Sequence, residues 1–239
     1  MMSLDFTNVR ALTFDCYGTL IDWETGLLAV LRPWADQSGL TDVDDTRLLA
    51  AFSRLEPVTQ AENPTAKYPE ILHRVMRRLA DSMGVGAGEA DCEALANSVG
   101  DWPAFADSPA ALSRLKERYK LIIVSNVDRA SFARSNERLG VAFDAIITAE
   151  DVGSYKPGPG HFHSAMDWLR AQKIERSALL HVAESLYHDH VPAKALGLRT
   201  IWIRRRREGV SRATRAPDAP VTPDATFATL GEFADSILG

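Results

Sequence analysis

The sequence has few cysteines and no long apolar run. Only two cysteines, Cys16 and Cys92, occur among its 239 residues, too few for a disulfide framework, so we expect reduced thiols. No stretch approaches the roughly 18 consecutive apolar residues that a membrane-spanning helix needs. The N-terminus also lacks the charged lead and apolar core of a secretory signal. We therefore predict a cytoplasmic protein without a membrane partner.

Basic residues are not in excess either. The chain has 27 lysines and arginines against 32 aspartates and glutamates, which gives a net charge of -5. Nucleic-acid-binding proteins usually present a basic face, so we expect no nucleic-acid partner. The run of four arginines at residues 204–207 is expected to be solvated or to lie at a subunit contact.

The order of the expected elements predicts an α/β fold. Within residues 21–100, apolar residues recur at intervals of three and four, which is typical of helices, and the second of these helices is expected to end at Glu56, before Pro57. From residue 110 onward, helices alternate with short apolar strands at 121–125, 145–148, 178–183 and 199–203 and near Thr226. This alternation indicates right-handed crossovers and a parallel sheet.

The first strand decides the expected domain organisation. Residues 9–14 form a short apolar run that is typical of a strand buried on both faces. Because one strand cannot form a sheet alone, it must belong with the later strands. We therefore predict a Rossmann-like core made of residues 1–20 and 101–239, with residues 21–100 inserted as an all-helical cap domain.

Polar side chains follow four of the expected strands. Open parallel sheets bind ligands beyond the carboxyl ends of their strands, so these side chains are expected to meet in one place. In chain order they are Asp15, Tyr17 and Thr19, then Ser125 and Asn126, then Lys156, and finally Glu184, Ser185 and Asp189. Taken singly, each has an ordinary explanation as a helix cap or a solvated loop residue. Their occurrence at four strand ends in order predicts a single site.

This order, with a helical block between the first two groups, resembles the haloacid dehalogenase superfamily over nearly the whole chain. The segment D-C-Y-G-T-L, in which Tyr17 stands two places after Asp15, is more similar to the 2-haloacid dehalogenase branch. The phosphatases of the superfamily generally carry a second Asp at that position. The resemblance implies a hydrolase that removes halide from a small 2-halocarboxylic acid through an aspartyl ester.

The resemblance also implies a role for each residue. Asp15 would attack the carbon that bears the halogen, and Thr19 would steady the developing charge. Lys156 would keep Asp15 ionised, because a nearby cation lowers the pKa of a carboxylate by roughly 1 to 3 units. Asp189 would orient Lys156 or the hydrolytic water. The expected substrate contacts are Tyr17, Ser125, Asn126, Ser185 and a cap arginine, either Arg32 or Arg54, for the substrate carboxylate.

The fourth strand end departs from the dehalogenase pattern. Glu184 stands where the phosphatases place an acid that binds Mg²⁺, so in a phosphatase Asp15, Glu184 and Asp189 would hold the metal. Glu184 could instead form a salt bridge with Lys156, and then no cofactor is needed. We favour the halide reaction, because a halide leaves without the general acid that an alkoxide requires, which is worth about 10²- to 10⁴-fold in rate.

Two further possibilities stay open at this point. The chain could be a non-catalytic relative that kept the fold and binds a small molecule without turning it over. It could also form a homodimer, as proteins of the superfamily often do.

Overall fold

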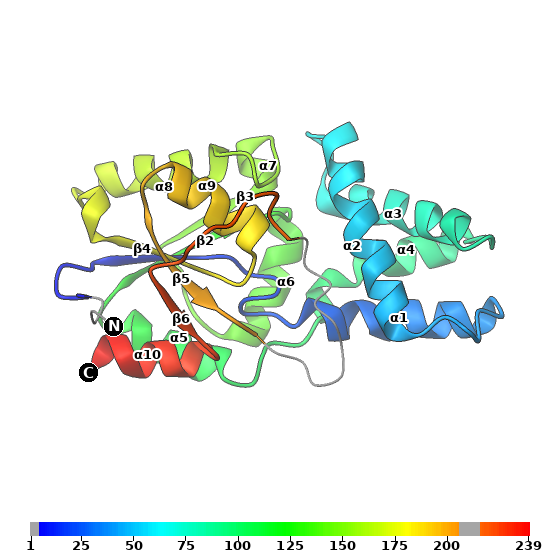
Figure 1. Cartoon of the computed structure of the whole chain (residues 1–239), viewed down its shortest axis with the longest axis horizontal. Helices are drawn as coiled ribbons and strands as arrows, with labels where there is room; N and C mark the ends of the chain where they lie inside the picture. Colours follow the sequence, from blue (N-terminus) through cyan, green and yellow to red (C-terminus); the bar gives the residue numbers. More distant parts are fainter. Residues whose placement is uncertain (1–4, 206–215) are drawn as a thin grey trace.

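One parallel sheet forms the centre of the molecule (Figure 1). The computed structural model describes residues 5–205 and 216–239. The strands are β1 (Ala11–Phe14), β2 (Lys120–Ser125), β3 (Ala145–Thr148), β4 (Leu179–Ala183), β5 (Arg199–Ile203) and β6 (Ala225–Phe227). Their order across the sheet is β3-β2-β1-β4-β5-β6, and all neighbours are parallel. The predicted Rossmann-like α/β core is confirmed.

Helices cover both faces of this sheet, because successive residues of a strand point to opposite sides. On β1, Leu12 and Phe14 belong to one apolar core and Ala11 to the other, and the whole strand is buried. One face is covered by α5 (Ser108–Lys116), α6 (Arg129–Leu139) and α10 (Leu230–Leu238), and the other by α8 (Gly160–Ala171) and α9 (Val191–Ala195). Figure 1 shows α8 and α9 on the opposite side of the sheet from α5 and α10.

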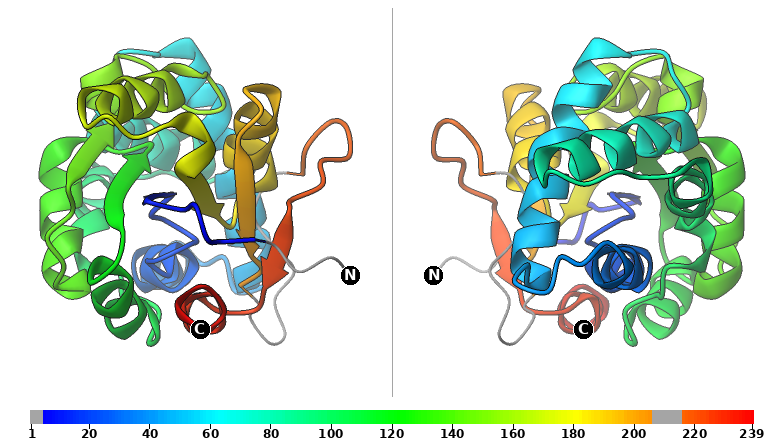
Figure 2. Two further views of the ribbon diagram at one scale, coloured as in Figure 1. Left: turned by 90° about the vertical axis from the view of Figure 1, so that its left-hand side faces the viewer. Right: turned by 90° about the vertical axis from the view of Figure 1, so that its right-hand side faces the viewer.

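The first four helices after β1 pack together at one end of the sheet, as Figures 1 and 2 show. We name them the cap helices: α1 (Trp23–Gln37), α2 (Asp45–Glu62), α3 (Tyr68–Ser82) and α4 (Glu89–Asn97). The chain enters and leaves this block side by side, because Ile21 forms an antiparallel bridge with Ala104. The domain boundaries at residues 20 and 100 stay a prediction.

Two helix boundaries differ from the sequence expectation. Helix α2 continues through Pro57 to Glu62, because a proline inside a helix removes one hydrogen bond without always ending the helix. After β4 the chain forms a π-helical turn, η3 (Leu186–His190), before the short α9, whereas the sequence predicts a helix only from His190 to Leu196. Both differences alter which side chains face the site described below.

The structure tests two expectations from the composition, namely that the chain has no membrane-spanning helix and that its cysteines are reduced. Within residues 5–205 and 216–239, no helix combines the length and the apolar character needed to cross a membrane. Cys16 and Cys92 are both buried free thiols, as expected. The cytoplasmic location stays a prediction.

Gly26 lets α1 approach Trp102 closely, and its replacement tests this packing. A Cβ at Gly26 would overlap ring atoms of Trp102, which is buried, is packed against Tyr17 and donates a hydrogen bond from Nε1 to Ser98 Oγ at 3.0 Å. We expect Gly26→Ala to lower the free energy of unfolding by about 1 to 3 kcal/mol, measured by chemical denaturation.

The matched control is Gly231→Ala in α10, where the nearest heavy atom to an added Cβ is 3.7 Å away. This variant should be as stable as the wild type or slightly more stable, because alanine favours the helix. Equal stability of the Gly26→Ala variant and the wild type would show that α1 and Trp102 are not in tight contact.

Candidate active site

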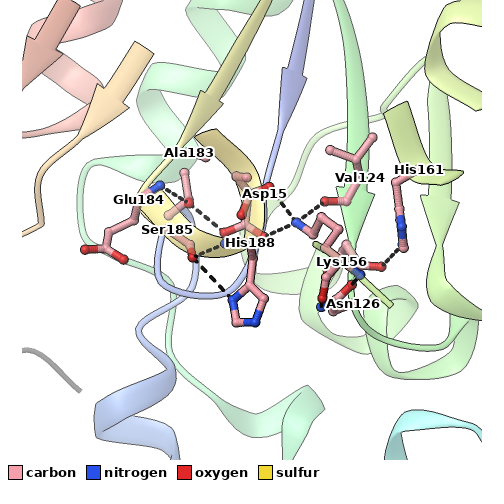
Figure 3. Close-up of polar contacts among 12 residues, drawn as sticks. Asp15, Val124, Asn126, Lys156, His161, Ala183, Glu184, Ser185 and His188 are labelled. Atoms are coloured by element: carbon pink, nitrogen blue, oxygen red, sulfur yellow. Dashed lines mark hydrogen bonds and ion pairs between the residues drawn. The ribbon is translucent and has the colours of Figure 1, made fainter. Parts of the chain in front are cut away.

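Polar side chains gather where the carboxyl ends of β1, β2 and β4 meet (Figure 3). The order of the strands reverses at β1, which is where open α/β sheets bind ligands. Asp15 follows β1 directly, and Gly18 then adopts the left-handed φ of 96° that turns the chain back. The turn brings the Thr19 hydroxyl to Asp15 Oδ2, to which it donates a hydrogen bond of 2.8 Å.

Lys156 lies at the centre of this group. Its side chain is 1% exposed, and Nζ donates hydrogen bonds to Asp15 Oδ1 at 2.9 Å, Asp189 Oδ1 at 2.7 Å and the carbonyl oxygen of Val124 at 2.9 Å. An ammonium has three protons, and these contacts occupy all of them. The salt bridge between Lys156 and Glu184, which the sequence left open as a possibility, is therefore not formed.

Asn126 holds Lys156 in place through its side-chain amide. Oδ1 of Asn126 accepts a hydrogen bond from the Lys156 backbone N–H at 2.7 Å, and Nδ2 donates to the Lys156 carbonyl at 3.1 Å. Both ends of the amide are thus used to fix the lysine loop. The amide thus positions the lysine loop, but its second Nδ2 proton is not used by these contacts and Asn126 lines the pocket described below, so the expected contact with the substrate carboxylate stays a prediction. Ser125, by contrast, has a buried Oγ that receives and donates no hydrogen bond in the described part of the chain.

Asp189 is carried by the π-helical turn η3 that follows β4. Its Oδ1 also lies 3.1 Å from His181 Nε2, and His181 Nδ1 lies 3.1 Å from the Thr13 hydroxyl. The turn is capped by Ser185, whose Oγ accepts a hydrogen bond from the backbone N–H of His188 at 3.0 Å. Asp189 Oδ2 is buried and has no hydrogen-bond partner among the described residues, so it can accept a hydrogen bond from a ligand or a water molecule.

The two carboxylates beside Lys156 are not equivalent. Burial and the charge of Asp189 raise the pKa of Asp15 and outweigh the effect of Lys156, contrary to the expected lowering. Burial also acts on Asp189, but the charges and hydrogen bonds of Lys156 and His181 hold the pKa of Asp189 well below its ordinary range. The pKa of Lys156 is raised, because both carboxylates outweigh its burial. Asp15 is therefore the more basic, and so the more nucleophilic, of the two acids.

A cavity of about 90 Å³ lies between these residues and the cap helices. A water molecule needs about 10 to 15 Å³ on the same measure, so the cavity accepts a small organic molecule. Its core wall contains Asp15, Tyr17, Trp102, Ser125, Asn126, Val127, Lys156, Glu184, Ser185, His188 and Asp189, and its cap wall contains Trp23, Phe52, Ser53, Glu56, Pro57 and Tyr68. Most residues expected at one site thus share one pocket.

Neither cap arginine lies in this pocket. Arg32 donates to the Val43 carbonyl at 2.6 Å and pairs with Asp36 at 2.9 Å on α1. Arg54 is exposed and lines a separate groove with Arg47. Residues two apart on a helix point to nearly opposite sides, so Arg54 faces away from the side of α2 that carries Glu56. The expectation that one of these arginines binds the substrate is therefore corrected.

Tyr17 lines the pocket, but its hydroxyl is bound elsewhere. The Oη atom lies 2.8 Å from the Ser135 hydroxyl on α6, and the ring packs edge-on against Trp102. Burial raises the pKa of Tyr17 well above its usual range. The phenol is thus oriented away from Asp15 and holds its proton tightly.

The sequence also contained a pocket residue that we did not expect, Glu56. Tyr68 Oη and Gln60 Nε2 both donate to Glu56 Oε1, at 2.8 and 3.0 Å, and enclosure raises the pKa of Glu56 to about 7. The signal was present in the sequence, because Leu48, Phe52 and Glu56 recur every four residues and so share one face of α2. An acid on an apolar helix face marks an inward-pointing carboxyl.

Arg205 is another residue near the site for which the sequence predicted no role there. Its Nε and Nη2 donate to the Thr19 carbonyl at 3.0 and 2.9 Å, and its Nη1 donates to Asp107 Oδ1 at 2.7 Å. Arg205 therefore fixes the loop behind Asp15 instead of being solvated. Residues 206 and 207 of the arginine run lie outside the described residues.

The three acids proposed for Mg²⁺ do not converge in this arrangement. Asp15 Oδ1 and Oδ2 are bound by Lys156 and Thr19, and Figure 3 shows the Glu184 carboxylate pointing away from Asp15. Among the described residues, no three His, Cys, Asp or Glu side chains are grouped so that they could bind a metal ion. The set Asp15, Glu184 and Asp189 does not fit a metal as placed.

Comparisons with known proteins agree with this fold. Residues 9–183 match the family model described as haloacid dehalogenase-like hydrolase. The haloacid dehalogenase-like hydrolase domain-containing protein 3 of Bos taurus is 27% identical over 210 residues, which cover 82% of each chain. An (S)-2-haloacid dehalogenase of Pseudomonas putida is 23% identical and covers 83% of this chain and 86% of its own. The structure of L-2-haloacid dehalogenase from Xanthobacter autotrophicus with covalently bound chloropropionic acid superposes with a TM-score of 0.79 at 16% identity, covering 97% and 99% of the two chains.

The raised pKa of Glu56 predicts a pH-dependent stability. Its ordinary pKa of 4.5 applies to the unfolded chain and about 7 to the folded one. Between these values the folded state binds more protons, so stability falls as the pH rises. Relative to Glu56→Gln, the wild type should lose on the order of 2 kcal/mol of unfolding free energy from pH 5 to pH 8, allowing for partial solvent contact.

Urea denaturation of both proteins at several pH values measures this difference. Glu62→Gln, on the same helix at a partly exposed site that pairs with Arg78, serves as the control and should keep the wild-type pH dependence. Parallel pH curves for the wild type and Glu56→Gln would mean that Glu56 titrates normally.

Proposed function

Because the chain belongs to the haloacid dehalogenase-like hydrolase family, we propose that it hydrolyses the carbon–halogen bond of a small 2-halogenated carbonyl compound. The 2-halocarboxylic acids expected from the sequence are members of this class. The observation that carries the proposal is the contact between Asp15 and Lys156 in a small pocket, next to a tyrosine in place of a second acid. The relatives that are named as 2-haloacid dehalogenases support it.

The leaving group is argued from Tyr17. A departing alkoxide is strongly basic and needs a proton donor, whereas a halide leaves without one. The Tyr17 hydroxyl is bound to Ser135, and its raised pKa makes it a weak acid. Because position 17 carries no acid that could protonate a leaving alkoxide, the site favours displacement of halide over cleavage of a phosphate ester.

The reaction then has two steps. A carboxylate oxygen of Asp15 forms a bond to the carbon bearing the halogen, and the halide leaves with the bonding electron pair. Water next attacks the carbonyl carbon of the resulting ester, which restores the Asp15 carboxylate and releases the 2-hydroxy product and a proton. Thr19 and Lys156 donate to the Asp15 carboxyl, and we assign the free Oδ2 of Asp189 to the hydrolytic water.

We propose no metal for this reaction. The donors of the alternative Mg²⁺ site are bound to Lys156 and Thr19 or point elsewhere, and the ammonium of Lys156 already lies between Asp15 and Asp189. A phosphatase remains the second candidate only through the position of Glu184 after β4. Chelation separates the two functions.

Purified protein should release chloride from 2-chloropropionate or chloroacetamide, and EDTA should leave the rate unchanged. Asp15→Asn should reduce the rate by on the order of 10⁴-fold, because it removes the nucleophile. Chloride is measured with an ion-selective electrode over many turnovers. Release of phosphate from p-nitrophenyl phosphate that EDTA abolishes would support the phosphatase instead. Inactivity toward both kinds of compound would favour the non-catalytic relative.

The ester intermediate predicts where oxygen from water goes. In a single turnover in H₂¹⁸O, the heavy oxygen should enter the carboxyl group of Asp15, because water attacks the ester carbonyl. Mass spectrometry of the peptide containing Asp15 should show a gain of about 2 Da, and the product should be unlabelled. Label in the product after one turnover would mean that water attacks the substrate directly.

A further inference from the structure

The cap wall of the pocket carries an acid and no cation. Among the described lining residues, Glu56 is the charged side chain of the cap wall, and Lys156 is the one lysine or arginine of the whole pocket. The protons of Lys156 are bound by Asp15, Asp189 and the Val124 carbonyl. A substrate carboxylate would therefore enter a site that holds several acids, in which the protons of the one ammonium are already bound and His188 is the other basic side chain of the lining.

Glu56 lines the cavity, and its two carboxylate oxygens differ in their hydrogen bonds. Both of its neighbours, Tyr68 and Gln60, donate to Oε1. Oε2 receives no hydrogen bond from residues 5–205 or 216–239 and can accept one from a ligand. Because a carboxylate accepts hydrogen bonds and donates none, a ligand group that meets this oxygen must carry an N–H or O–H.

Two hydroxyls in the pocket complete the pattern. Ser53, one turn before Glu56 on α2, and Ser125 at the end of β2 both have buried Oγ atoms without partners among the described residues. Each hydroxyl can donate to a carbonyl oxygen. A primary amide offers a carbonyl oxygen to a serine and an N–H to Glu56, whereas a carboxylate satisfies the serines but repels the acid. An unmade buried hydrogen bond is costly, so this difference affects binding.

We propose that Glu56 is a specificity-determining residue that selects the uncharged amide of a 2-halocarboxylic acid over the acid itself by accepting an N–H of the substrate. This inference rests on the proposed carbon–halogen hydrolysis and names its substrate class. With chloroacetamide, Asp15 would form an ester to the CH₂ group with release of chloride, and water would then release glycolamide and a proton.

The test compares kcat/KM for chloride release at pH 8 from chloroacetamide, chloroacetate and chloroacetone. For each compound, the rate measured with Asp15→Asn is subtracted, because these compounds also release chloride when they alkylate thiols. Chloroacetone has the size of the amide but no N–H. The wild type should prefer the amide over both other compounds by about tenfold or more, the effect of one hydrogen bond or one like charge. Glu56→Gln should reduce the preference over the acid by about tenfold, because it removes the charge.

Glu62→Gln on the same helix is the matched control and should keep the wild-type preferences. An equal kcat/KM of the wild type for the amide and for either chloroacetate or chloroacetone would overturn the inference. An unchanged preference for the amide over the acid in Glu56→Gln would overturn it as well. If Glu56→Gln does not fold, the comparison of amide and chloroacetone in the wild type still decides.

Failure of the proposed function has a different signature. No chloride from any of the three compounds would reject carbon–halogen hydrolysis, and the role of Glu56 is then read from binding. Calorimetry with glycolamide and glycolate should show tighter binding of the amide to the wild type, and Glu56→Gln should reduce that difference. Equal binding of both compounds to the wild type would reject the role of Glu56 as well.

Discussion

The site depends on one buried ammonium held between two carboxylates. Lys156 contacts Asp15 and Asp189 with a side chain that is 1% exposed, and each of the three would be costly to bury alone. Removing one partner from such a group typically costs about 3 to 5 kcal/mol, because the remaining charges are left uncompensated. The position of each acid therefore fixes the position of the lysine, and the lysine in turn keeps two like charges close together.

The sheet provides this arrangement because its strand order places β1 between β2 and β4. Asp15 follows β1, the Val124 carbonyl comes from β2, and Asp189 follows β4, so three neighbouring strands each supply one partner of Lys156. The lysine itself arrives on a loop that Asn126 clamps through two backbone hydrogen bonds. The strand order and the clamped loop thus bring together residues that are far apart in the sequence.

The core wall could be predicted from the sequence, and the cap wall could not. Asp15, Ser125 and Asp189 follow apolar runs, and parallel strands bring their carboxyl ends to one edge, so spacing alone places them together. Side chains on a cap helix face the pocket only at certain rotations, so spacing could not distinguish Arg32 or Arg54 from Glu56. We also expected α2 to end before Pro57, and so did not predict the helical turn after Glu56. Contacts within the site, such as the clamp by Asn126, depend on loop geometry that no periodic pattern encodes.

The two walls of the pocket divide the chemistry. The core wall holds Asp15, Lys156 and Asp189, to which we assign the proposed bond cleavage, and none of their contacts would distinguish one small 2-halogenated compound from another. The cap wall would contact the part of the substrate that does not react, and on this wall the Glu56 carboxyl lies among Phe52, Tyr68 and Trp23. Because an acid and an arginine impose opposite charges on a ligand, relatives that share the core wall can still differ in substrate. A change of one cap residue can therefore alter specificity while leaving bond cleavage intact.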